Sequence, residues 1–198
     1  YGGLRFFERQ EIKDALAYLR LLHNRDDDTS FERAVNTPTR GIGNTTMEKL
    51  REISRASAVS LWMAAKNARG QLGRSAGNVD LFLKLIDDLH TETSELPLSK
   101  ATELIIARTG LREHYRKEKG EQAEGRLENL DELISAARSF ETDPTARAAA
   151  DGENPDEPVL DPLTAFLTHA ALESGEQQSG PRASGGAAMS TRVDPPRA

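Results

Sequence analysis

The sequence predicts an all-α fold: a multi-helix subdomain in which a Gly-Ile-Gly turn joins two helices in a helix–hairpin–helix-like arrangement. Apolar residues recur at the spacing of one helix face along much of the chain, and no segment alternates with the period of a strand. Residues that begin or end helices flank these segments. The helical pattern covers, in chain order, residues 12–22, 79–89, 127–137 and 163–170.

Boundary residues define further helices. Thr45 and Glu48 have the spacing of a capping box, which predicts a helix from about residue 45 to 56. Ser99 is expected to cap a helix that stops at Gly110, since glycine favours helix C-termini. Asp161 precedes a proline, the pattern of an N-cap followed by proline at the first helical position.

The composition divides the chain into one domain and a tail. We expect an ordered domain over residues 1–176, interrupted by a flexible acidic loop at 142–159, and an appended, disordered tail at 177–198. The loop and the tail both combine Pro, Gly and small or charged residues, and they hold too little apolar surface to offset the entropy of ordering.

Charge and cysteine content exclude several protein classes. The 198 residues carry a net charge of −6 and no cysteine, which excludes disulfide scaffolds and thiolate metal sites. No apolar run is long enough to span a membrane, so we expect a soluble, cytoplasmic protein. Residues 1–120 carry 20 basic and 17 acidic side chains, against 6 and 15 in residues 121–198. A polyanion would therefore meet the first part of the chain.

The most informative stretch is residues 31–46, where a short apolar helix, a proline, a Gly-Ile-Gly turn and a new helix follow one another. Gly41 and Gly43 can adopt positive φ and allow close backbone approach, while Ile42 can fill the gap between the two helices. The unpaired N–H groups of the turn and of the helix start then form an anion site, helped by the helix dipole.

Backbone donors bind phosphate without reading bases, so this turn predicts binding to duplex DNA irrespective of sequence. A tight connection that binds nothing is the alternative. Hydroxyl, amide and guanidinium groups nearby would add donors around the same oxygens. The candidate DNA contacts are Thr37, Thr39, Arg40, Gly41, Ile42, Gly43, Asn44 and Thr45.

Two other segments carry weaker signals. Arg116, Lys117 and Lys119 form a possible secondary DNA contact, although interspersed glutamates also allow a partly neutralised surface. Gly2 and Gly3, beside Tyr1, permit a backbone rotation and are candidates for a hinge, with a frayed terminus as the alternative.

The sequence holds no nucleotide-binding or catalytic motif. It lacks the G-x-x-x-x-G-K-[ST] loop, G-x-G-x-x-G, H-E-x-x-H and G-x-S-x-G. The four histidines lack metal-ligand spacing. We therefore predict no catalytic residue, no metal ligand and no cofactor in this chain, and no enzymatic activity of the chain alone.

Several long strings nevertheless resemble one family. YGGLRFFERQEIKDALAYLRL at residues 1–21 and FERAVNTPTRGIG at 31–43 closely resemble the 2B subdomain of bacterial UvrD/Rep/PcrA-type helicases of superfamily 1, the UvrD branch most. Further similar strings are GL at 110–111, EKGE at 118–121, RLENL at 126–130 and PLTAFLTHAALE at 162–173. The resemblance covers residues 1 to about 176.

The resemblance implies an accessory part of an ATP-dependent 3′–5′ DNA helicase of DNA repair. In that family two RecA-like domains bind ATP, Mg and single-stranded DNA. The helical 2B insertion swivels about a hinge and holds duplex DNA through its Gly-Ile-Gly turn. Implied partners are duplex DNA, the remaining helicase domains and repair proteins. After Gln178 this sequence departs from the family pattern.

Two hypotheses follow for the chain itself. The first is a 2B subdomain that contacts duplex DNA and regulates unwinding by swivelling. The alternative is a protein-interaction or autoinhibitory module that docks on the helicase core or on repair partners, with little DNA binding of its own.

Overall fold

The fold was obtained as a computed structural model that describes residues 6–118, 120–143 and 161–175. Within these ranges it is helical and has no strand, which confirms the predicted fold class. The helices, in chain order, are α1 (Gln10–His23), α2 (Asp28–Ala34), α3 (Asn44–Ser57), α4 (Leu61–Asn67), α5 (Ala76–Thr93), α6 (Leu98–Arg108), α7 (Leu111–Arg116), α8 (Glu121–Thr142) and α10 (Pro162–Glu173). Two 3-10 turns, Arg69–Gln71 and Gly73–Ser75, precede α5.

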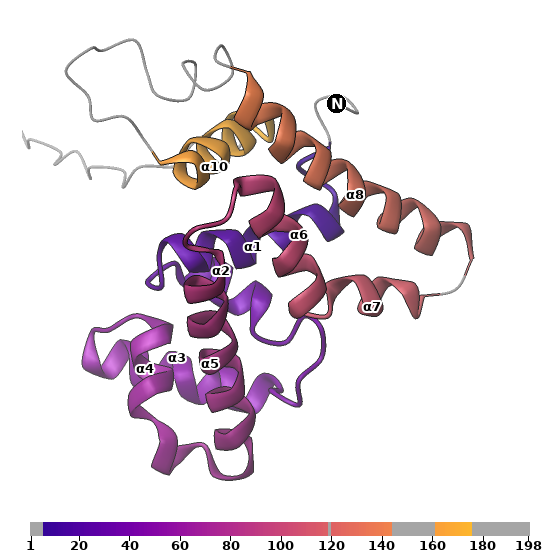
Figure 1. The fold of residues 1–198 in the computed structure, drawn as a ribbon. Helices are drawn as coiled ribbons and strands as arrows, with labels where there is room; N and C mark the ends of the chain where they lie inside the picture. The colour runs from indigo at the N-terminus through magenta and orange to yellow at the C-terminus, as the bar shows by residue number, and fades with distance from the viewer. Residues whose placement is uncertain (1–5, 119, 144–160, 176–198) are drawn as a thin grey trace, which may run out of the picture.

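Helix α1 lies at the centre and contacts α2, α5, α6, α7, α8 and α10 (Figure 1). Ten of its fourteen residues are buried, which explains why its sequence is apolar on more than one face. Helices α3 and α4 lie at one end of the molecule, and α8 and α10 lie at the other (Figure 1).

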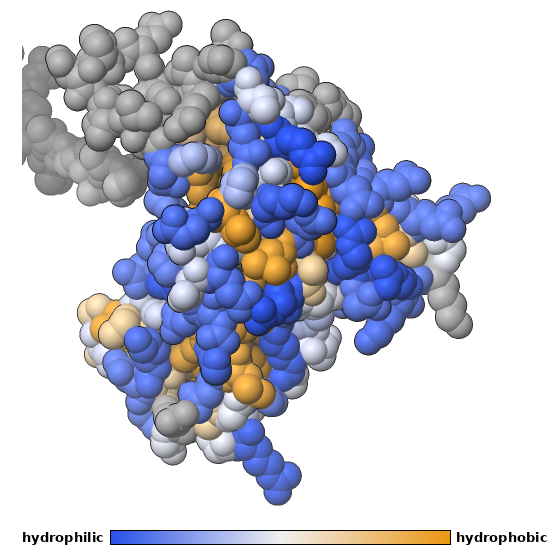
Figure 2. All heavy atoms as spheres, in the orientation of Figure 1, coloured by the Kyte–Doolittle hydropathy of each residue, from blue (hydrophilic) through white to orange (hydrophobic). Residues whose placement is uncertain are grey.

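The core is one continuous cluster in which aromatic rings join helices distant in sequence. Phe31 of α2 meets Phe82 of α5 edge-on at 5.6 Å between ring centres, and Phe140 of α8 meets Phe166 of α10 at the same separation. Hydrophilic side chains cover most of the surface seen in Figure 2, and apolar atoms show through near the middle of this face.

The helix boundaries confirm some capping predictions and correct others. The Asp161 side chain accepts hydrogen bonds from the amides of Leu163 and Thr164 and so caps α10 as predicted. Helix α3 begins one residue before the predicted position, and its N-cap, Gly43, makes no side-chain capping bond. The expected capping box at Thr45 therefore does not form.

The prediction that Ser99 caps α6 is wrong, because Ser99 lies inside the helix, after Leu98. The cap comes from elsewhere: the Glu141 carboxylate on α8 accepts from the Ser99 amide at 2.9 Å and from its hydroxyl at 3.0 Å. Gly110 follows the end of α6 with φ of 82°, in line with its predicted role as a stop.

Most of the predicted acidic loop and the whole predicted tail lie outside the described residues. The first loop residue, Thr142, is the last residue of α8, so the helix extends slightly further than the sequence suggested. Gly2 and Gly3, the predicted hinge, also lie outside the described ranges.

Candidate nucleic-acid interface

The Gly-Ile-Gly turn connects the end of α2 to the start of α3. Ile42 is 1% exposed and belongs to the core cluster, in line with the buried position that the sequence predicted for it. Gly41 has φ of 71°, a left-handed conformation that favours glycine, whereas Gly43 is extended. The buried isoleucine anchors a turn whose two glycines are exposed.

The amide groups of this turn divide into two sets. Those of Arg40 and Ile42 donate to the side-chain oxygen Oδ1 of one residue, Asn36, at 2.7 and 3.3 Å. For the amides of the second set, no acceptor is found in the described part of the chain. They belong to exposed residues at the turn and at the start of α3: Gly41, Gly43, Asn44 and Thr45.

The free amides therefore lie where the sequence placed an anion site. Asn44 and Thr45 are the first two residues of α3, whose N–H groups have no partner within the helix. They carry the partial positive charge of the helix dipole, and the exposed side chains of Thr39, Asn44 and Thr45 add polar groups beside them.

The side chain of Arg40 bonds groups of the protein itself, whereas the sequence predicted that it would contact DNA. Its guanidinium donates to the carbonyl oxygens of Ala34 at 3.1 Å, Pro38 at 3.0 Å and Thr109 at 2.9 Å. It also lies over the rings of two buried residues, Tyr18 and Phe82. Arg40 thus holds the turn against α1, α5 and the end of α6, and its charged head points into the protein.

Tyr18 supports the same turn from α1. Its hydroxyl donates to the carbonyl oxygens of Ala34 and Thr37, which places the backbone of Thr37 against the body of the protein. Burial raises the pKa of Tyr18 far above its ordinary value, more than the positive charge of Arg40 lowers it. The hydroxyl therefore remains a donor over the whole physiological pH range.

Sequence reasoning missed the residues that approach the turn from the start of α5 and from the 3-10 turn before it. Asn78 donates from Nδ2 to the carbonyl oxygen of Gly41 at 3.5 Å, and the hydroxyl of Thr46 bonds that of Ser75 at 2.9 Å. These contacts join residues about 30 positions or more apart, so no local pattern could have indicated them. Two basic side chains are exposed on these segments: Lys49 on α3 and Arg74 on the 3-10 turn before α5.

The second predicted DNA contact lies outside the turn, at the C-terminal end of α7 and just after it. Arg116 forms an ion pair with Glu113, and Lys117 is exposed. Lys119 lies outside the described residues. Nearby, Arg112 pairs with Asp131, so much of this basic segment is neutralised by acidic neighbours.

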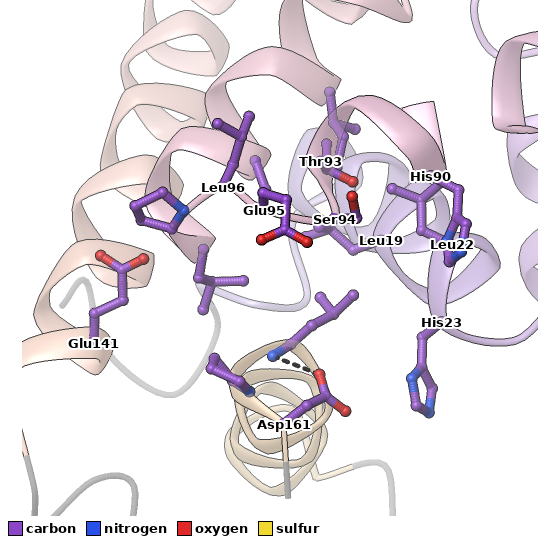
Figure 3. Close-up of a pocket in the computed structure, with 16 residues that line it drawn as sticks. Leu19, Leu22, His23, His90, Thr93, Ser94, Glu95, Leu96, Glu141 and Asp161 are labelled. Carbon is purple, nitrogen blue, oxygen red and sulfur yellow. Dashed lines mark hydrogen bonds between the residues drawn. The ribbon is translucent and has the colours of Figure 1, made fainter. Parts of the chain in front are cut away.

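A cavity of about 830 Å³ lies away from the turn, between the ends of α1 and α5 and the starts of α6 and α10 (Figure 3). Leucine side chains form much of its wall, including Leu19, Leu22 and Leu96. None of the described residues that line it is Lys or Arg. Its acidic and histidine side chains are Glu95, Glu141, Asp161, His23 and His90.

Asp161 remains ionised at this rim. Burial raises its pKa. Hydrogen bonds from the hydroxyl and amide of Thr164 and from the Leu163 amide, together with the nearby His23, lower the pKa by more than burial raises it. The net result is a pKa below the ordinary aspartate value. The described residues hold no group of three or more acidic or histidine side chains suited to a metal ion. No helix among them has the length and apolar character to cross a membrane.

Comparison with known proteins identifies the family. Residues 1–185 match the model of the UvrD-like helicase C-terminal domain. The chain is 48% identical to DNA helicase II of Haemophilus influenzae over 187 residues, which are 93% of this chain and 24% of that protein. It is equally identical to DNA helicase II of Escherichia coli over 182 residues, 90% of this chain and 24% of the relative.

The ATP-dependent DNA helicase PcrA of Bacillus subtilis is 40% identical over 142 residues, 71% of this chain and 19% of that protein. The chain thus spans about a quarter of the length of the DNA helicase II proteins it matches. The match over nearly the whole chain shows that it belongs to the UvrD-like helicase C-terminal domain family.

Proposed function

We propose that this chain is the accessory 2B subdomain of an ATP-dependent 3′–5′ DNA helicase of DNA repair, acting in the bacterial cytoplasm. Its membership of the UvrD-like family and its similarity to DNA helicase II support this assignment. ATP and Mg would bind the remaining helicase domains, because this sequence carries no nucleotide-binding loop. The chain alone would then hydrolyse no ATP.

Its contribution to the helicase would be to hold duplex DNA through the Gly-Ile-Gly turn. The observation that carries this proposal is that the amides of four exposed residues, Gly41, Gly43, Asn44 and Thr45, have no acceptor among the described residues. A phosphate oxygen would accept from them at the positive end of α3. Backbone donors carry no base information, so binding would not depend on DNA sequence.

The remaining predicted contacts would divide by role. Thr39 would add a hydroxyl at the phosphate, whereas Thr37, Arg40 and Ile42 would shape the turn from inside. Lys117, which is exposed directly after α7, would be the best placed of the secondary basic residues to reach a further phosphate. Rotation of the subdomain about Gly2 and Gly3 would move the held duplex and so regulate unwinding.

A titration of fluorescently labelled duplex with the 198-residue chain tests the proposal. Anisotropy should report binding at low salt that weakens linearly on a log–log plot as salt rises. Thr45→Glu should abolish much of this binding, because it puts a negative charge at the phosphate site while the helix dipole stabilises the folded helix.

Gln122→Glu is the matched control, since it makes a similar change at the second residue of another exposed helix start, that of α8. Its duplex affinity should stay within twofold of the parent chain. Equal affinities for the Thr45 variant and the parent, or no duplex binding at low salt, would contradict the proposal.

A second candidate function, a docking module, is favoured by the apolar cavity between α1, α5, α6 and α10. The occupant would be a segment of the remaining helicase domains that carries apolar and basic side chains. Such a segment would match the leucine walls and an acidic rim whose described residues include no Lys or Arg. In a complete helicase, Leu96→Asp should then release the contact and change the rate of unwinding. An unchanged rate would reject this function.

A further inference from the structure

Asn36 is the one side chain in the described structure that accepts hydrogen bonds from the amides of the turn. It follows the C-terminal end of α2, and its side chain is half-buried. Its Oδ1 atom accepts from the amide of Arg40, four residues ahead, and from that of Ile42, six residues ahead. One oxygen thus gathers two donors that are two residues apart.

These two bonds decide which amides remain available. A buried or half-buried N–H group needs an acceptor, and Asn36 satisfies both groups of this turn that point inward. Within the described part of the chain, no acceptor is found for the amides of the intervening Gly41 and of the next three residues, Gly43, Asn44 and Thr45. The Asn36 carboxamide is therefore the acceptor for the inner set of amides.

The other anchors of the turn act on carbonyl groups instead. Tyr18 bonds the carbonyl oxygens of Ala34 and Thr37, and Arg40 bonds those of Ala34 and Pro38. These contacts fix where the turn lies against the body of the protein. In the described structure, Asn36 is the side chain that bonds the N–H groups of this turn directly.

We propose that Asn36 is a positioning residue for phosphate binding, which orients the outer amides of the Gly-Ile-Gly turn without touching DNA itself. This inference rests on the proposed DNA-binding function. Asparagine suits the role because its oxygen accepts two bonds while remaining neutral. An aspartate would accept the same bonds but would place a negative charge beside the bound phosphate.

The test compares three variants of the 198-residue chain. Asn36→Ala removes both bonds, and Asn36→Asp keeps the acceptor oxygens. Asn24→Ala is the matched control, because the Asn24 side chain makes the same type of bond, at 2.9 Å to the Asp26 amide, in the turn after α1. The measurements are duplex affinity by anisotropy, amide hydrogen exchange by NMR, and thermal unfolding.

Asn36→Ala should weaken duplex binding about fivefold to tenfold, the equivalent of one hydrogen bond in free energy. Its Arg40 and Ile42 amides should exchange faster, while amides within α3 keep their protection. Asn36→Asp should restore slow exchange at both amides and yet bind duplex more weakly than the parent. Asn24→Ala should keep the parent's duplex affinity.

Two results would overturn the inference. One is parent-like duplex affinity in Asn36→Ala, and the other is a loss of affinity that Asn24→Ala shares, which would indicate a general effect of stability. If the parent chain itself binds no duplex, the proposed function fails instead. In that case the exchange rates of Arg40 and Ile42 still show whether Asn36 orients the turn.

Discussion

The guanidinium of Arg40 donates a hydrogen bond of 2.9 Å to the carbonyl oxygen of Thr109, 69 residues further along the chain. Thr109 directly follows α6, so this bond joins the Gly-Ile-Gly turn to the C-terminal end of α6. The exposed amides of the turn are held on a platform that a distant helix end helps to build. Changes at Arg40 should therefore affect folding before they affect any ligand.

Arg40→Ala should lower the free energy of unfolding by about 2 to 4 kcal/mol, because three carbonyl groups lose a charged donor and two rings lose a stacked cation. Arg40→Lys should recover little, since an ammonium group does not reproduce the planar fork of guanidinium. Urea unfolding followed by circular dichroism measures both. A loss below about 0.5 kcal/mol would show that Arg40 is free to serve DNA directly.

Gly41→Val should weaken duplex binding while the helices remain folded. A side chain at φ of 71° costs about 1 to 2 kcal/mol, and its Cβ would come within 2.8 Å of Asn78 Nδ2. Gly43→Ala is the control, because Gly43 has φ of −86° and nothing lies within 4 Å of an added Cβ. Thermal unfolding should separate the two variants, and similar melting temperatures would argue against strain at Gly41.

Glu141→Ala should destabilise the fold by about 1 kcal/mol through loss of the cap on α6. The reason is that the Ser99 amide, in the first turn of α6, would lose its acceptor. Chemical denaturation gives the value. Glu173→Ala, a change at an exposed residue at the end of α10, serves as the comparison. Its free energy of unfolding should stay within about 0.5 kcal/mol of the parent value.

The stability of the protein should fall in acid partly through Asp161. Its pKa is lower in the folded chain than in the unfolded one, so the folded state releases this proton more readily. The associated stabilisation is present above the unfolded pKa, about 3.9, and is lost as the pH falls through the folded pKa.

Asp161→Asn isolates this effect, because asparagine also caps helices but does not titrate. The variant should unfold with a shallower dependence on pH below about pH 4 than the parent does. Parallel curves from denaturation at several acidic pH values would assign the acid sensitivity to other carboxylates, such as Glu32, whose pKa is lowered by its hydrogen bond to Arg51.

The predicted helices were recovered from the sequence because their signals are local. The apolar periodicity of 12–22 and 79–89 lies within α1 and α5, and the Asp161 cap needs only the next three residues. The prediction for Ser99 failed for the opposite reason. The acceptor of its amide is Glu141, 42 residues away, and no local pattern shows which helix end a distant carboxylate will reach.

The residues of the candidate site also fall into those that the local sequence predicts and those whose role depends on distant contacts. The buried Ile42 and the left-handed Gly41 follow from residue type, and both were expected from the Gly-Ile-Gly string. The inward direction of Arg40 was not, because an arginine beside a presumed phosphate site favours a role in binding until its partners are known. Those partners come from α1, α2, α5 and the end of α6.

By itself the sequence determined the all-α class, the main helices, the position of the turn and the likeness to a helicase subdomain, since periodicity, glycine geometry and residue strings are properties of neighbouring positions. Only the tertiary structure decided which polar groups are bonded inside the protein and which are not. Hydrogen-bond partners are chosen by proximity in space, and packing brings together groups that the chain keeps far apart. At this turn packing satisfies Arg40 and leaves four amides exposed.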